Sequence, residues 1–410
     1  MKTLGSSLLT LTLLKYILLA TFVISTYFTG RTIFQRPTSS TLVIVSLLLM
    51  PIYAHKVHVG FSHTILLLNA ISCTFLTYCL VIKNNKPLHF ALFGLAIAMG
   101  IYSKYNYIIF ISALFFTTLS LKELRLKFFN QRLLISIFVV LVLTLPLIGW
   151  WLSNYQEALQ AIAEKGNKSN SLSHLIAQNL LECTLFVTPF IWLFIPEKST
   201  LITPHASDNH IYLNLFKRAH LILLLLFLIC MAVGIGFKQR YLFPFFYLLP
   251  FWIFLKLDVS GYSHAFLKRF FTWSAIATIL IVFIRLIQIK FVAFFISTSR
   301  LSLPIMPTFK KIPEHIIADS NIIITDHQLY ANTLMTVPPS QLLYNATPHV
   351  YTHKKNCFIL TSSQGDSSTI SSQHDYAFTE PYGRFYFTLY LDKTHESECA
   401  SFFSQSDVAS

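Results

Sequence analysis

Long apolar runs separated by short polar segments occupy the first 300 residues of the chain. A helix crosses a bilayer core of about 30 Å with roughly 20 apolar residues, and most of these runs approach that length. The sequence therefore predicts a polytopic α-helical membrane protein with about ten membrane helices. The predicted spans are 8–29, 40–54, 63–82, 88–102, 105–121, 132–152, 174–195, 219–236, 240–256 and 270–296.

The pattern changes near residue 300. Short apolar runs at 321–325 and 357–361, and an alternating run at 385–391, predict strands. A helix is predicted at 326–334. Strands and helices in alternation favour a small α/β unit. The predicted domains are a multi-helix membrane domain, 1–299, and a soluble, extracytoplasmic α/β domain, 300–410.

Composition supports a surface that is covered by lipid. Only 12% of the residues are charged and 54% are hydrophobic, with a mean hydropathy of +0.59. A soluble domain carries about 25% charged residues, a larger fraction than this chain has. The net charge is +14, but the basic residues lie mainly in short loops, where they contact anionic headgroups. Nucleic acid is therefore not an expected partner.

The loops alternate in their basic residues, and the richer set is expected in the cytoplasm because of the positive-inside rule. The poorer set and the tail then lie on the outer face, where Cys357 and Cys399 could keep a disulfide, a pairing that stays open. The richer set is Arg31, Arg36, Lys83, Lys86, Lys122, Arg125, Lys127, Arg132, Lys198, Lys217, Arg218, Lys256, Lys268 and Arg269. The poorer set is Lys56, Lys104, Lys165, Lys168, Lys238 and Arg240.

Two outward segments carry cations at helix ends. Lys104 interrupts an apolar stretch, which is either one broken helix or two helices that meet at a sharp turn. Lys238 and Arg240 form a second cluster before Pro244. Lysine binds phosphate as a point charge and arginine binds it through a planar fork. The alternatives are an interfacial lysine that extends to the headgroups and an ordinary loop beside an aromatic belt.

Histidine and acidic residues offer weaker candidates for catalysis. His63 opens a predicted helix after His55 and His58, and neutral histidines can bind metal or act as a general base. Solvated interfacial histidines are the alternative reading. Glu182 lies inside a predicted span, where a carboxylate is costly unless it faces a cavity. We expect no cofactor, and a divalent metal stays an open alternative.

Four segments resemble, in order and spacing, those of the bacterial RgtA/B/C/D-like glycosyltransferases, which have the GT-C fold. The resemblance covers most of residues 40–345. The segments are 94–105, which ends in Lys104-Tyr105; 145–151 with Asn154; 237–244, which contains Lys238, Arg240 and Tyr241; and 330–334 before Pro338.

The resemblance implies hexosyl or pentosyl transfer from a polyprenyl-phosphate-linked sugar to a lipid or glycan acceptor, as in lipopolysaccharide synthesis. The reaction would occur on the outer face of the plasma (inner) membrane, with membrane lipids as further partners. The implied residues for binding the donor phosphate are Lys104, Tyr105, Lys238, Arg240 and Tyr241.

The sequence differs from the family where the family carries its acidic catalytic residue. The family carries an acidic catalytic loop before the matching segments, and we expect this chain to begin after that loop. Residues 61–64, Phe-Ser-His-Thr, stand where the family has an Asp at a helix start. Whether the chain transfers sugar by itself therefore stays open. The alternatives are an inactive relative that binds lipid phosphate and a lipid or glycan transporter.

Overall fold

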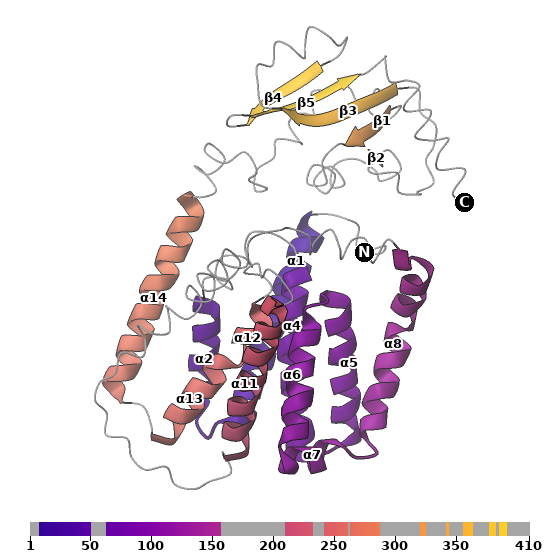
Figure 1. Ribbon diagram of the computed structural model, residues 1–410. Coiled ribbons are helices and arrows are strands. Elements are labelled where there is room, and N and C mark those ends of the chain that lie inside the picture. The colour runs from indigo at the N-terminus through magenta and orange to yellow at the C-terminus, as the bar shows by residue number, and fades with distance from the viewer. Residues whose placement is uncertain are drawn as a thin grey trace. The chain divides into compact units, whose positions relative to one another are not determined.

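The computed structural model describes the helical segments and a sheet (Figure 1). Contacts divide the chain into two units, of which one is Thr12–Ile281 and the other combines Met1–Leu11 with Val282–Ser410. The described residues are 8–50, 63–156, 210–232, 242–260 and 263–287, and the strands between 320 and 391.

Five described helices are long and apolar enough to cross a membrane, namely α1 from Thr12, α4, α8, α11 and α14, and a sixth span results if α6 and α7 are counted together. This confirms a polytopic helical membrane protein. Ten helices stay a prediction, because the span at 174–195 lies outside the described residues. The helices are α1 (Leu8–Ile33), α2 (Pro37–Leu49), α4 (His63–Asn84), α5 (Pro87–Ser103), α6 (Tyr107–Ser120), α7 (Lys122–Phe128), α8 (Leu133–Ser153), α11 (His210–Ala232), α12 (Phe243–Phe246), α13 (Leu249–Ser260) and α14 (His264–Ile287).

Two segments that were predicted as loops are helical. α11 begins at His210, so Lys217 and Arg218 lie within it. Buried residues at Leu215, Phe216, Ala219 and Leu223 follow helical spacing, and the two cations occupy the exposed face between them. The cations at 122–127 belong to α7, a short helix that the loop prediction missed.

Helices α4, α5, α6 and α8 run alternately in opposite directions, as contacts at their two ends show. At one end, the Arg132 guanidinium donates to the Asn85 carbonyl, which joins the start of α8 to the α4–α5 turn. At the other end, the Lys104 ammonium donates to the hydroxyl of Thr64, near the start of α4. The α5–α6 turn therefore lies at the end opposite the basic α4–α5 and α7–α8 turns.

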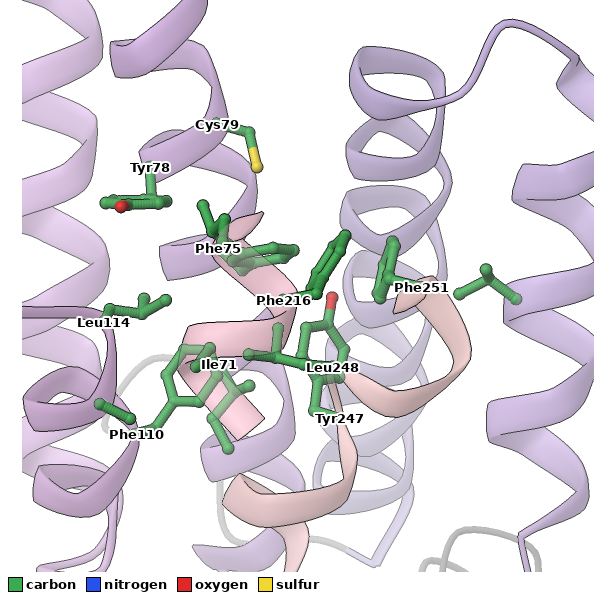
Figure 2. Packing of buried hydrophobic residues seen from close by; sticks show 14 of the residues in the cluster. Ile71, Phe75, Tyr78, Cys79, Phe110, Leu114, Phe216, Tyr247, Leu248 and Phe251 are labelled. Carbon is green, nitrogen blue, oxygen red and sulfur yellow. The ribbon is translucent and has the colours of Figure 1, made fainter. Parts of the chain in front are cut away.

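An aromatic cluster forms the core of the helical unit, with α4 at its centre (Figure 2). The ring of Phe75 lies 5.9 Å from Phe216, 6.2 Å from Tyr247 and 5.6 Å from Phe251, measured between centroids. In its most apolar window α4 is 78% buried, whereas α8 and α14 are each 11% buried. α4 carries hydroxyl and amide side chains that need partners within the protein, and it lies inside the bundle, whereas the more apolar α8 is largely exposed.

Hydroxyl groups join the helices across this core. Ser72 and Tyr78 of α4 pair with Ser25 of α1 and Thr118 of α6, at 2.7 and 2.6 Å. Such pairs satisfy polar groups that have no water partner in hydrocarbon, and each contributes about 0.6 kcal/mol. The pairs therefore fix the rotation of each helix more than they add to its stability.

The second unit contains a mixed five-stranded sheet in the order β2-β1-β3-β5-β4. β1 pairs in parallel with β2 and β3, and β5 pairs antiparallel with β3 and β4. The three predicted strands are confirmed, and the short β2 and β4 were missed. The predicted helix at 326–334 lies outside the described residues, so the α/β class stays a prediction. The strands are β1 (Ser320–Ile324), β2 (Leu342–Leu343), β3 (Asn356–Ser363), β4 (Ala377–Tyr382) and β5 (Phe385–Leu391).

Helices α5 and α8 approach each other closely at Gly94. A Cβ placed there would lie 2.6 Å from the Ser136 carbonyl oxygen and 3.0 Å from its Cα. The Ser136 hydroxyl donates to the carbonyl of Phe90 at 2.6 Å, so this contact is also polar. Small residues allow such backbone approach between membrane helices.

Gly94→Ala should lower the free energy of unfolding by about 1–3 kcal/mol, because the obstructing atoms belong to the backbone and cannot rotate away. Gly149→Ala in α8 is the matched control, because a Cβ there has no neighbour within 4 Å. The control should be unchanged or more stable by up to about 1 kcal/mol. Thermal unfolding of the purified proteins in detergent tests this, and equal midpoints for the two variants would contradict the close packing.

Candidate functional site

The segment around Lys104 is a turn between two separate helices. α5 ends at Ser103, and Lys104 has an extended backbone, with φ −164° and ψ 147°. The carbonyl of Lys104 accepts a hydrogen bond from the backbone N–H of Tyr107 at 3.0 Å, which begins α6. Of the two alternatives left open by the sequence, the structure has two helices meeting at a sharp turn.

Gly100 allows this turn to close. A methyl group added at Gly100 would overlap the ring of Tyr107, which therefore lies directly against α5. The Tyr107 hydroxyl reaches the buried Thr74 hydroxyl of α4 at 2.6 Å. The glycine before Lys104 thus lets an aromatic side chain tie the start of α6 to the central helix.

The ammonium of Lys104 is held at the end of the bundle. It donates to the hydroxyl of Thr64, whose side chain is buried, while Lys104 is half-buried. A hydroxyl oxygen is an uncharged hydrogen-bond acceptor, so this bond orients the ammonium group. An oriented, partly buried cation is suited to an anionic ligand such as a phosphate.

Aromatic side chains surround this end of α5, α6 and α8. Tyr105 is 60% exposed, and Trp150, Trp151 and Tyr155 are exposed near the end of α8. Tyr102 donates to the carbonyl of Leu143 at 2.9 Å, close to the proline within α8. Tyrosine and tryptophan collect where a membrane meets water, so Lys104 lies at the level expected for lipid headgroups.

The structure brings together three of the predicted site residues. His63, Lys104 and Tyr105 lie at the same end, with His63 exposed and adjacent in sequence to Thr64. The remaining predicted residues fall outside the described part of the chain, namely Glu182, Lys238, Arg240 and Tyr241. The helices that flank residues 233–241 do meet, since the rings of Phe227 and Phe245 are 5.5 Å apart.

Carboxylates are few in the helices that the structure describes. Within the described helical residues the acidic side chains are Glu123 and Asp258, and Glu123 lies in α7, at the end opposite Lys104. Across the same described ranges, no group of three His, Cys, Asp or Glu side chains could hold a metal ion. The described site is therefore cationic and aromatic.

Sequence reasoning missed two partners of the site, Thr64 and Thr74. Each lies at least 30 residues from the side chain it contacts, because Lys104 bonds to Thr64 and Tyr107 to Thr74. A hydroxyl residue beside the first residue of an apolar helix was the available signal for Thr64. For Thr74 the sequence offered no local signal.

Tyr107→Phe and Thr74→Val should each destabilise the protein, because each removes one hydroxyl of the buried pair and leaves the other without its partner. The double variant should cost less than the sum of the two by about 0.6 kcal/mol, the usual coupling of such pairs in membranes. Unfolding free energies of the four proteins in a double-mutant cycle measure this coupling. A coupling energy of zero would show that the hydroxyl pair does not hold α6 to α4.

Comparison with known proteins supports the family resemblance. Residues 1–150 match the family described as dolichyl-phosphate-mannose-protein mannosyltransferase. The chain is 26% identical over 265 residues to the lipopolysaccharide core galacturonosyltransferase RgtB of Rhizobium johnstonii. The match covers 63% of this chain and 54% of RgtB, so the chain spans about half the length of this curated relative. No solved structure matches the chain. Over part of its length, the chain is thus similar to membrane glycosyltransferases of the GT-C type.

Proposed function

We propose that this protein binds a polyprenyl-phosphate-linked sugar on the outer face of the membrane and transfers the sugar to a lipid or glycan acceptor. The observation that carries the proposal is the Lys104 ammonium, which Thr64 orients at one end of the helical unit. It lies within residues 1–150, which match a family whose name specifies a sugar linked to dolichyl phosphate. RgtB, by its name, acts on the lipopolysaccharide core, which suggests an acceptor of that class.

The donor phosphate requires more than one cation. A phosphate that leaves water with an unpaired charge costs several kcal/mol, so a single lysine is a weak site. Lys238 and Arg240 lie in the sequence between α11 and α12, and we propose that they join Lys104 around the phosphate, with Tyr105 and Tyr241 as hydrogen-bond donors. The contact of Phe227 with Phe245 supports the proposal in one respect, because the two helices on either side of these residues meet.

Transfer would break the bond between the sugar and the phosphate and form a bond from the sugar to an acceptor oxygen. The phosphate leaves with the electron pair, and the acceptor hydroxyl loses its proton to a base. His63 is the described candidate for that base, and Glu182 is the candidate from the sequence. We expect no metal to be needed, because the cations of the site can stabilise the leaving phosphate.

A second candidate function is lipid-phosphate binding without transfer. The observation that favours it is the position of Glu123, which is the only acidic residue in positions 1–150 and lies at the end opposite Lys104. A protein of this kind would hold the donor for another polypeptide that supplies the base.

Lys104→Ala should weaken binding of polyprenyl phosphate by about ten- to a hundredfold, because hydrogen bonds to charged groups contribute roughly 1.5–3 kcal/mol. Lys268→Ala is the matched control, because Lys268 is exposed in α14 and belongs neither to the proposed phosphate site nor to the basic turns beside α7. Titration of the purified full-length protein with labelled polyprenyl phosphate measures the affinity.

Two further variants refine that test. Arg240→Lys keeps the charge but loses the planar fork, so its binding should weaken as well. If Lys104→Ala and Arg240→Ala bind the carrier as tightly as the parent, the shared phosphate site is wrong. If the parent binds the carrier but moves no labelled sugar to an acceptor, the second candidate function replaces the first.

The orientation follows from the asymmetry of the loops and can be tested on both sides of the membrane. In a variant whose native cysteines are replaced by Ser, we expect Tyr105→Cys to react with a membrane-impermeant thiol reagent in intact cells, because Tyr105 is exposed at the end that we propose faces outward. Lys127→Cys, exposed at the other end, should react only after permeabilisation. A reporter fused after Ser410 should work only when it is exported. The reverse labelling pattern would refute the outward-facing site.

A further inference from the structure

We propose that α7 and the two turns beside it form a binding surface for the headgroups of anionic diacyl phospholipids. This surface lies at the end of the helical unit opposite Lys104, and its function does not depend on sugar transfer. It consists of Lys83, Lys86, Lys122, Arg125, Leu126, Lys127 and Arg132.

α7 lies across the end of the bundle. The chain bends by 111° between α6 and α7, and α7 contacts both α6 and α4 (Figure 1). A helix at this angle to a membrane-crossing helix runs close to the plane of the membrane. The headgroups of the surrounding lipids lie in that plane.

The inner face of α7 is anchored in the core. Leu124 is 1% exposed and Phe128 is 6% exposed. The ring centroid of Phe128 lies 5.4 Å from that of Tyr78 in α4 and 5.4 Å from that of Phe93 in α5. These contacts fix which side of the short helix faces away from the protein.

The outer face combines positive charge with an apolar side chain. Arg125 and Lys127 are exposed, and Leu126 between them is 69% exposed. An exposed leucine beside two cations suits the boundary where headgroups meet acyl chains. Among the described residues of this surface, Glu123 is the acidic one, compared with the six cations named above.

A polar contact holds the neighbouring turns on the same surface. Asn85 has a left-handed backbone, with φ 47°, a conformation that asparagine adopts more readily than most residues. Its carbonyl accepts from the Arg132 guanidinium, and its side-chain oxygen accepts from the Asn130 amide at 3.1 Å. The α4–α5 turn, with Lys83 and Lys86, is thereby joined to the end of α7.

Phospholipid headgroups fit this surface better than free phosphate does. The cations are spread along a helix and two turns rather than gathered around one point, which suits several headgroups. A basic residue near an anionic membrane surface adds roughly fivefold to binding. The apolar helices hold the surface next to the lipid continuously, whereas a soluble anion would be bound only from solution.

The experiment uses the full-length protein purified in detergent. Native mass spectrometry measures how much phosphatidylglycerol it retains relative to phosphatidylcholine. The test variant is Lys122→Gln/Arg125→Gln/Lys127→Gln. The matched control is Lys217→Gln/Lys268→Gln/Arg269→Gln, which removes three exposed charges elsewhere. Unfolding midpoints in phosphatidylcholine show whether each variant is folded.

We expect the parent to prefer phosphatidylglycerol and the α7 variant to lose at least about tenfold of that preference, since three basic residues are removed. Glu123→Gln should raise retention by up to roughly fivefold, which a merely damaged fold would not do. Lys104→Ala should leave phosphatidylglycerol retention unchanged, which separates this surface from the proposed polyprenyl-phosphate site.

Three results would overturn the proposal. The first is that the α7 variant retains phosphatidylglycerol like the parent. The second is that the control loses as much preference as the α7 variant, which would indicate a diffuse effect of charge. The third is complete displacement of the lipid by inorganic phosphate, which would identify a site for soluble anions instead.

Discussion

Polar groups inside a membrane protein have to find partners within the protein, and in the described part of the helical unit α4 provides several of these partners. Its Ser72 pairs with α1, its Thr74 and Tyr78 pair with α6, and the Asn69 amide donates to the carbonyl of Leu18 at 2.9 Å. Lipid is as apolar as the helix surfaces, so hydrophobic burial alone would leave the helices free to rotate. The hydroxyl and amide pairs remove that freedom.

The same helix determines where the candidate site lies. Thr64 and Thr74 are both on α4, ten residues or about 15 Å apart along its axis. Thr64 accepts a hydrogen bond from Lys104, which precedes α6, and Thr74 bonds to Tyr107 deeper in the bundle. The Lys104 turn is therefore attached to the most buried helix at two depths. Its ammonium thus keeps a defined position at the end of the bundle.

The sequence predicted the most regular elements well, for a physical reason. The limits predicted for α4, α5 and α8 are correct within two residues, because polar loops bound these apolar runs closely. The start of α11 was missed, because its first turns are amphipathic and resemble a loop when hydrophobicity alone is read. α7 was missed because it has only seven residues, of which four are charged.

The candidate site shows the same division between local and distant information. Lys104 could be found from its neighbours, because a charge that interrupts an apolar run is visible in any short window. Its bond to Thr64 could not be found, because 40 residues and a reversal of direction separate the two. The end of the bundle at which Lys104 lies could also be predicted, by counting the helices that precede it. The side chains that hold the turn in place could be identified only from the packing of α4 against α5 and α6.

The geometry also restricts which group can activate an acceptor. A general base has to approach the proton it removes within about 3 Å. Glu123 follows the whole of α6, and 14 residues of helix separate the two ends by about 21 Å. Glu123 therefore cannot serve an acceptor bound beside Lys104. In the part of the chain that the structure describes, the imidazole at the correct end is His63, which precedes the threonine that orients Lys104. The cation and the candidate base thus depend on the same first turn of α4.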